Sequence, residues 1–106
     1  MADPKPPAPQ KLSAARIAAL LPTLDGWETH YDALFKTVKL ADFRAAMALL
    51  NRVADIAEAA QHHPDFTVKY NRVDFVLTTH DAGGLSELDF AVAAKIDAAA
   101  RDAAAR

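Results

Sequence analysis

The stretch FTVKYNRVDFVLTTH, from Phe66 to His80, decides the fold. Its two halves alternate apolar with polar residues and are rich in β-branched and aromatic side chains, which is typical of half-buried strands. Asn71 tolerates a positive φ, so Asn71-Arg72 is predicted to be the two-residue loop of an antiparallel hairpin. Pairing Tyr70 with Val73 then gathers the apolar side chains on one face: Phe66, Val68, Tyr70, Val73, Phe75 and Leu77.

The same register, carried outward, brings histidines together at the open end of the hairpin. It sets His63 opposite His80, with His62 beside them, and it sets Lys69 opposite Asp74. Opposed Cβ atoms lie about 4.5–5.5 Å apart, so the sequence predicts a cluster of three histidines. Side chains at such an open end bury little surface, so we expect their truncation to leave stability almost unchanged.

Two long helices and two further strands account for most of the remaining chain. Asp42 is predicted to cap a helix over residues 43–60, and Ser86 a final helix whose Asp89 completes a Ser-x-x-acid capping box. A strand over residues 33–40 follows a shorter one. This order predicts an α+β fold, with a four-stranded antiparallel sheet, two long helices on one face and a short N-terminal helix. The apolar stripe of the first long helix is expected to face the core: Phe43, Met47, Leu50, Val53 and Ala57.

Composition and charge exclude several classes of function. The 106 residues carry a net charge of −2 and no Lys/Arg cluster interleaved with aromatic residues, so a direct nucleic-acid partner is not expected. There is no cysteine, no signal-peptide pattern and no apolar run near the ~18–20 residues of a membrane span, so a cytoplasmic protein is expected. Residues 1–10 hold four of the six prolines and are predicted to be a disordered tail before a single domain over residues 11–106.

The histidines belong to motifs with characteristic separations along the chain. The motifs are Glu58-x-x-x-His62-His63-Pro64, Tyr70-Asn71 and Thr78-Thr79-His80-x-x-x-Gly84-Leu85-Ser86-x-x-Asp89, together with Gly26-Trp27 and Asp42-Phe43. Over residues 13–100 this pattern resembles the pterin-4a-carbinolamine dehydratase family. Phe66 departs from this pattern, because many members have tryptophan there. The change alters the shape of one wall of the expected site and removes no proton-transfer group.

The resemblance implies a reaction and an assembly. The reaction is loss of water from 4a-hydroxytetrahydropterin to give quinonoid dihydropterin, in tetrahydrobiopterin and pterin recycling after aromatic amino-acid hydroxylation. It needs an acid and a base that work near neutral pH, which histidine supplies, and neither a metal nor a redox cofactor. The resemblance also implies a small subunit that forms homodimers or homotetramers, in the pathway of an aromatic amino-acid hydroxylase.

Roles for individual residues follow from the same resemblance. The catalytic set is expected to be His62 and His80 for proton transfer, with His63 holding the pterin. Asp89 is expected to contact the pterin or a histidine as well as to cap its helix. Glu58 is either a solvated glutamate or a residue that orients a histidine. The expected substrate-binding residues are His63, Pro64, Thr78, Thr79, Asp89 and Glu58.

Three alternatives stay open at the level of sequence. Adjacent histidines at the start of a strand also occur as plain polar loop residues. Three histidines are also a set of ligands that suits a metal ion, although no metal or other cofactor is expected here. Some relatives are non-catalytic proteins that stabilise dimers of a homeodomain transcription factor or assist assembly of carboxysomal Rubisco. His30, in the first hairpin, is expected to be a solvated surface residue.

Overall fold

The computed structural model describes residues 9–104, and the predicted tail over residues 1–10 falls almost entirely outside them. In chain order the described elements are α1 (Ala14–Leu20), η1 (Leu21–Thr23), β1 (Glu28–His30), β2 (Ala33–Lys39), α2 (Phe43–Ala60), β3 (Asp65–Lys69), β4 (Arg72–Leu77), η2 (His80–Ala82) and α3 (Glu87–Ala104), where η marks a 3₁₀ helix. The predicted α+β fold with two long helices and a short N-terminal helix is confirmed.

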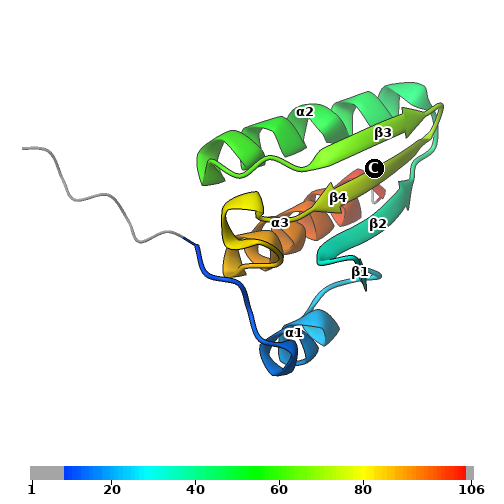
Figure 1. Cartoon of the computed structure of the whole chain (residues 1–106). Helices are drawn as coiled ribbons and strands as arrows, with labels where there is room; N and C mark the ends of the chain where they lie inside the picture. The colour runs from blue at the N-terminus through cyan, green and yellow to red at the C-terminus, as the bar shows by residue number, and fades with distance from the viewer. Residues whose placement is uncertain (1–8, 105–106) are drawn as a thin grey trace, which may run out of the picture.

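The four strands form one antiparallel sheet in the order β1-β2-β4-β3, so β1 and β3 are its edges. Figure 1 shows α2 and α3 lying together behind this sheet, with α1 at the β1 edge. Every second residue of β4 is buried on this side, namely Val73, Phe75 and Leu77. The core therefore lies between one face of the sheet and the two long helices.

Helix α2 begins and ends where the sequence predicts because both of its ends are capped. At the N-terminal end the Asp42 carboxylate accepts the backbone N–H of Ala45 at 2.8 Å. At the C-terminal end Gln61 takes the left-handed conformation, with φ 49°, and its N–H bonds back to helix carbonyls. This turn at Gln61 directs the following residues away from the helix axis.

The buried stripe of α2 differs in part from the predicted one. Leu50, Val53 and Ala57 are buried as expected, but Phe43 and Met47 are 50% and 39% exposed. The buried stripe begins at Ala46 and Leu49, which neighbour the predicted positions. The residues of α2 that face the core are Ala46, Leu49, Leu50, Val53 and Ala57. The prediction for Phe43 and Met47 is therefore wrong, and both side chains lie on the outer side of the first turns.

The β3–β4 hairpin is shifted by two residues from the predicted register. Val68, rather than Tyr70, opposes Val73, and the loop is Tyr70-Asn71. Tyr70 takes the positive φ of this loop, at 51°. A shift of two residues keeps the strand side chains on their own faces, so Phe66 and Val68 still share a face with the buried residues of β4. Tyr70 lies in the loop and is 66% exposed, so its predicted place on that face and the predicted pairing are wrong.

The shift has a physical cause outside the hairpin. The Asn71 side chain donates to the backbone carbonyl of Leu40 at 3.0 Å, and the Leu40 N–H donates to the Asn71 carbonyl at 2.7 Å. These bonds hold Asn71 in the loop beside the end of β2. Lys69 consequently opposes Arg72, so the predicted pairing of Lys69 with Asp74 is also wrong.

A buried carboxylate attaches the segment before β1 to the last helix. Asp97 of α3 is 3% exposed and accepts three hydrogen bonds: from Lys36 Nζ at 2.7 Å, from Trp27 Nε1 at 2.8 Å and from the Asp25 N–H at 2.9 Å. Breaking a buried ion pair by removing one partner costs about 3–5 kcal/mol. This cluster therefore fixes Trp27 and β2 against α3.

Among residues 9–104, no helix is both long enough and apolar enough to cross a membrane.

Candidate active site

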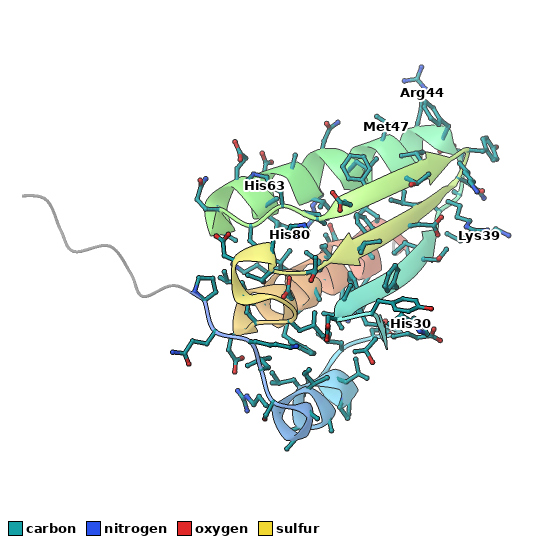
Figure 2. The ribbon with its side chains drawn as sticks, in the orientation of Figure 1. His30, Lys39, Arg44, Met47, His63 and His80 are labelled. Carbon is teal, nitrogen blue, oxygen red and sulfur yellow. The ribbon has the colours of Figure 1, made fainter. Side chains whose placement is uncertain are left out.

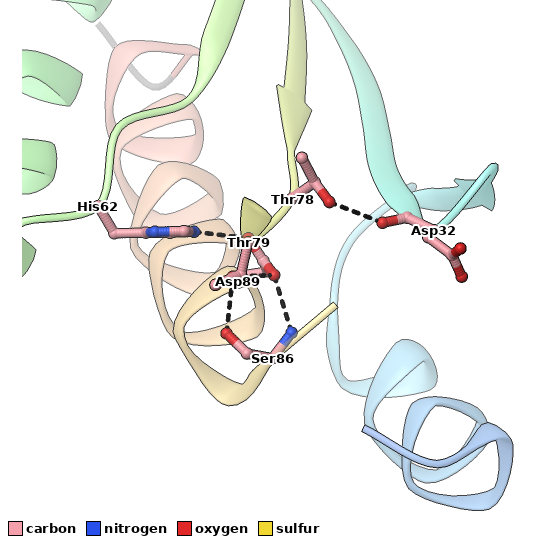
Figure 3. Close-up of polar contacts among 6 residues, drawn as sticks. All are labelled: Asp32, His62, Thr78, Thr79, Ser86 and Asp89. Atoms are coloured by element: carbon pink, nitrogen blue, oxygen red, sulfur yellow. Dashed lines mark hydrogen bonds and ion pairs between the residues drawn. The ribbon is translucent and has the colours of Figure 1, made fainter. Parts of the chain in front are cut away.

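The first turn of α3 holds a carboxylate in a fully buried position. The Ser86 N–H donates to Asp89 Oδ2 at 2.9 Å, which is one half of the predicted capping box. The Ser86 hydroxyl bonds to Thr79 Oγ1 at 2.7 Å, and Thr79 Oγ1 donates to Asp89 Oδ2 at 2.8 Å (Figure 3). Asp89 is 0% exposed, so its carboxylate is removed from water with these donors in place.

His62 contacts the other oxygen of the same carboxylate. Its Nε2 lies 2.6 Å from Asp89 Oδ1 (Figure 3). The left-handed turn at Gln61 lets the His62 N–H bond to the Ala57 carbonyl at 3.1 Å, which directs the side chain toward the start of α3. The His62 side chain is only 10% exposed, so the expectation that it would bury little surface is wrong, because Asp89 holds the ring inward.

The hydrogen bond to Asp89 also determines which nitrogen of His62 is free. A carboxylate only accepts hydrogen bonds, so His62 Nε2 carries the proton that it donates. No described residue makes a hydrogen bond to His62 Nδ1, and within residues 9–104 no buried side-chain nitrogen or oxygen lacks a partner. His62 Nδ1 therefore reaches solvent, with a lone pair available in the neutral ring.

A second histidine and carboxylate form a pair on the surface. His63 Nε2 lies 2.6 Å from Glu58 Oε2, and the two side chains are 58% and 71% exposed. Glu58 stands in the last turn of α2, and His63 follows the turn that ends this helix. The sequence left open whether Glu58 is solvated or orients a histidine; in the structure it is exposed and contacts His63.

His80 is placed differently from the prediction. β4 ends at Leu77, and Thr79 makes an isolated bridge with Gly84, so the chain enters η2 at His80. His63 precedes β3 and lies outside the strand pairing. The predicted opposition of His63 and His80 across the hairpin is therefore wrong.

The three histidines nevertheless lie at the same end of the molecule. His62 and Thr79 both bond to Asp89, and His63 and His80 are their respective neighbours in the chain. Figure 2 shows His63 and His80 at this end, between the end of α2 and the end of β4. The buried carboxylate thus holds His62 directly, and strand register does not pair His63 with His80.

A groove of about 550 Å³ opens beside His63. It runs between α2 and the edge strand β3, and most of its walls are apolar, including Pro64 and Phe66. Its polar side chains are His63, Glu58 and Asn51. Such a groove suits a flat ligand with one polar edge, since apolar walls supply contact and a few polar groups set orientation.

Thr78, another predicted substrate-binding residue, has a structural contact. Its hydroxyl donates to the backbone carbonyl of Asp32 at 2.8 Å (Figure 3). Tyr31 and Asp32 form the turn between β1 and β2, with φ values of 50° and 60°, the pattern of a type I′ turn. Thr78 therefore ties this turn to the end of β4.

Two residues of the site were missed by reasoning from sequence. The Ser86 hydroxyl, considered only as a helix cap, contacts Thr79 across the Gly83-Gly84 turn; a hydroxyl residue seven positions after Thr79 was the available signal. Asn51 lines the groove two turns before Glu58 on α2, and this seven-residue spacing on one helix face was the signal for it.

Taken together, these groups are suited to proton transfer. The pair His63–Glu58 lines the groove, and the pair His62–Asp89 and His80 supply further donors and acceptors at the same end of the molecule, as general acid–base catalysis needs. In the described part of the chain, no three His, Cys, Asp or Glu side chains are grouped so that they could hold a metal ion.

Comparison with known proteins gives consistent similarities. The family model described as "Pterin 4 alpha carbinolamine dehydratase" matches residues 10–99. A protein of Thermomicrobium roseum named as a pterin-4-alpha-carbinolamine dehydratase is 54% identical over 86 residues, which are 81% of this chain and 92% of the relative. A protein of the same name from Stenotrophomonas maltophilia is 45% identical over 97 residues, 90% of this chain and 84% of the relative.

Two solved structures share the fold. A transcriptional coactivator/pterin dehydratase from Brucella melitensis superposes with a TM-score of 0.84 at 35% identity, covering 86% of this chain and 99% of that one. A pterin dehydratase-like protein identified as a RuBisCO assembly factor in the alpha-carboxysome superposes with a TM-score of 0.61 at 28% identity, covering 72% of this chain and 90% of that one.

Proposed function

The chain belongs to the pterin-4a-carbinolamine dehydratase family, and we propose that its histidines carry out the dehydration by general acid–base catalysis. The activity is that of a pterin-4a-carbinolamine dehydratase, a hydro-lyase, because relatives of that name share 45–54% identity over most of the chain. The observation that carries the catalytic proposal is the contact of 2.6 Å between His62 and the fully buried Asp89.

The reaction itself needs two proton transfers. In a 4a-carbinolamine the hydroxyl sits on a carbon bonded to nitrogen. The C–O bond breaks as the oxygen is protonated and leaves as water, while the nitrogen loses its proton and forms a double bond to the same carbon, giving quinonoid dihydropterin. One base and one acid therefore suffice, and a positioned group of this kind contributes about 10²–10⁴-fold.

We assign the base to His62 and the acid to His80. The donation from His62 Nε2 to Asp89 leaves the Nδ1 lone pair facing solvent, where it is able to take the proton of the pterin nitrogen. His80 is exposed in η2, directly after Thr79, which leaves its ring free to protonate the departing hydroxyl. The two histidines approach the same end of the molecule from different elements.

Substrate binding is assigned to the groove beside His63. In this proposal His63 holds the pterin, Glu58 sets the direction of the His63 ring, and Pro64 provides an apolar wall. Thr79 and Asp89 are 5% and 0% exposed, so they act on the substrate through His62 and without touching it.

A non-catalytic assembly role is the second candidate. It is motivated by the carboxysomal RuBisCO assembly factor with the same fold. The dehydratase is favoured because the matches to proteins of that name are higher in identity and because the histidines and both carboxylates are present together. A pull-down from the source cells would recover an assembly partner if the second candidate were the main function.

Self-association and cellular setting extend the proposal. We propose a homodimer or homotetramer that works in the cytoplasm, in pterin recycling for an aromatic amino-acid hydroxylase. Exposed apolar side chains on α2 and β3 support self-association: Phe43, Met47 and Phe66 are 50%, 39% and 53% exposed. Light scattering at micromolar concentration that gave a stable 11.4 kDa monomer would contradict it.

The direct experiment is an assay with synthetic 4a-hydroxytetrahydropterin, followed by absorbance. Purified protein should accelerate the loss of water beyond the buffer rate, and prior metal analysis of the same sample separates acid–base catalysis from a three-histidine metal site. A rate equal to that in buffer, from folded protein, would remove the dehydratase assignment.

A further inference from the structure

We propose that Thr79 and Ser86 are positioning residues, whose hydroxyls act through Asp89 to fix the orientation and tautomer of His62. The inference rests on the proposed function, since it assigns what holds the proposed base in place. Both residues are buried, at 5% and 1% exposed, so neither reaches a substrate directly. Their contribution has to pass through the groups that they bond to.

The direction of each hydrogen bond follows from the chemistry of the groups. Thr79 has one hydroxyl proton, and it is donated to Asp89 Oδ2, which only accepts. The 2.7 Å contact between Thr79 Oγ1 and Ser86 Oγ therefore uses the Ser86 proton. The result is a chain of donors from Ser86 to Thr79 to Asp89, which meets the donation from His62 Nε2 at the other carboxylate oxygen.

This arrangement leaves the Asp89 carboxylate with one favourable orientation. Oδ2 accepts two bonds, from Thr79 Oγ1 and from the Ser86 N–H, and Oδ1 faces His62. Thr79 is itself held by paired backbone bonds with Gly84, at 3.0 and 3.3 Å. Because the carboxylate is anchored on one oxygen, its other oxygen selects the Nε2–H form of His62 and keeps Nδ1 outward.

Removal of the Thr79 hydroxyl should loosen this selection without changing the shape of the site. Thr79→Val keeps the branched side chain and deletes the donor to Asp89 Oδ2. We expect kcat to fall by roughly 10–100-fold, the range found for partners that orient metal-bound histidines, while KM changes less than about threefold. Thr79→Ser restores the hydroxyl and should recover kcat to within about threefold.

Ser86 supplies the second test because its hydroxyl reaches Asp89 only through Thr79. Ser86→Ala keeps the backbone N–H on Asp89 and removes one proton donor to Thr79, so a smaller loss of kcat, roughly 3–10-fold, is expected. The double variant Thr79→Val/Ser86→Ala should lose little more than Thr79→Val alone, since residues in one network are not additive. Independent losses that multiply would overturn the chain of donors.

The deciding measurement is ¹⁵N NMR of the histidine rings in ligand-free protein. Wild type should show His62 protonated on Nε2, and Thr79→Val should show a mixture of tautomers, while the signals of His63 and His30 stay unchanged. A folded Thr79→Val protein with wild-type kcat and an unchanged His62 tautomer would overturn the inference. If Thr79→Val does not fold, the same two readouts on Ser86→Ala decide it.

Failure of the proposed function would look different. If His62→Ala kept full activity, the acid–base assignment would be wrong, yet the NMR spectra of Thr79→Val would still report whether Thr79 fixes His62. A variant that only melts at lower temperature, with kcat and tautomer as in wild type below melting, would reduce Thr79 to a structural residue and overturn the inference.

Discussion

Two histidine–carboxylate pairs stand near each other, with the same separation and opposite surroundings. His62–Asp89 and His63–Glu58 both measure 2.6 Å, but the side chains of the first pair are 10% and 0% exposed and those of the second 58% and 71%. In the buried pair the carboxylate has further donors that hold it, whereas the surface pair is surrounded by water. Distance alone therefore does not distinguish a rigid contact from a replaceable one; burial and additional partners do.

The difference suggests a division of labour. A buried carboxylate that accepts from Thr79, from the Ser86 N–H and from His62 cannot turn easily, so the ring that it holds is already in position before substrate binds. Glu58 and His63 stand at the mouth of the groove, where a ligand is able to replace water around them.

The largest effect on stability is expected at the buried carboxylate. Asp89→Ala leaves Thr79, Ser86 and His62 without their shared acceptor and should lower the free energy of unfolding by about 3–5 kcal/mol. Glu58→Ala makes the same chemical change on the surface and should cost no more than about 1 kcal/mol. Urea unfolding of both variants tests the comparison, and equal losses of unfolding free energy in the two variants would contradict it.

A buried carboxylate outside the site provides the matched control for activity. Asp97→Ala should also destabilise the fold, because Asp97 accepts from Lys36 and Trp27 at 3% exposure. Its kcat, measured well below the melting temperature, should equal that of wild type. Loss of kcat in Asp97→Ala as large as in Asp89→Ala would mean that stability, and not the contact with His62, controls the rate.

The next effect concerns catalysis by the histidines. His62→Ala and His80→Ala should each lower kcat/KM by about 10²–10³-fold, within the range for one general acid–base group. The double variant should lose less than the product of the two single losses, since both groups serve one step. His30→Ala is the control, because His30 contacts Glu28 and Phe35 on the surface of β1, the edge strand opposite β3. Full activity in both single variants would refute the assignment.

A smaller change is expected for the surface pair. His63→Ala and Glu58→Ala should raise KM by about tenfold each, which corresponds to the loss of one hydrogen bond of about 1.4 kcal/mol, with kcat within about threefold of wild type. Steady-state kinetics at varied substrate concentration separate the two constants. A fall in kcat with an unchanged KM would instead place His63 in proton transfer.

The smallest effect concerns a partly buried carboxylate outside both pairs, Asp74. The Thr37 hydroxyl, and then Arg72 and Lys69, lower the pKa of Asp74 below its usual value of 3.8. A lowered folded-state pKa adds stability above the usual value, and this contribution disappears as the pH falls through the lowered pKa. Asp74→Asn should thus cost less than about 1 kcal/mol at pH 7 and nothing near pH 2. The free energies of unfolding of wild type and Asp74→Asn at both pH values measure this effect. A difference between the two proteins that grows toward acid pH would contradict the prediction.

Sequence reasoning succeeded where the signal is local. The Asp42 cap and the Ser86–Asp89 box mark the starts of both long helices, and alternation identifies the residues of β4 that face the core. These features depend on neighbours three or two positions apart, which the sequence displays directly.

It failed where the deciding partner is distant in the chain. The hairpin register depends on the bonds of Asn71 with Leu40, 31 positions away. Likewise, the burial of His62 depends on Asp89, 27 positions on, and that of Lys36 on Asp97, 61 positions on. Local periodicity carries no information about such pairs. The histidine cluster was therefore predicted from strand register, whereas in the structure His62 is placed by its contact with Asp89.

Because Trp27 donates a hydrogen bond to Asp97, its fluorescence can be used to follow unfolding around α3. Trp27 is the single tryptophan and is 5% exposed, and its partner Asp97 lies eight residues beyond Asp89, about 12 Å along α3 at 1.5 Å per residue. The fluorescence of Trp27 therefore reports on the surroundings of Asp97, where no histidine of the site makes a hydrogen bond among the described residues. When fluorescence and turnover are recorded during the same titration with urea, a loss of turnover that precedes the change in emission identifies opening of the catalytic end alone.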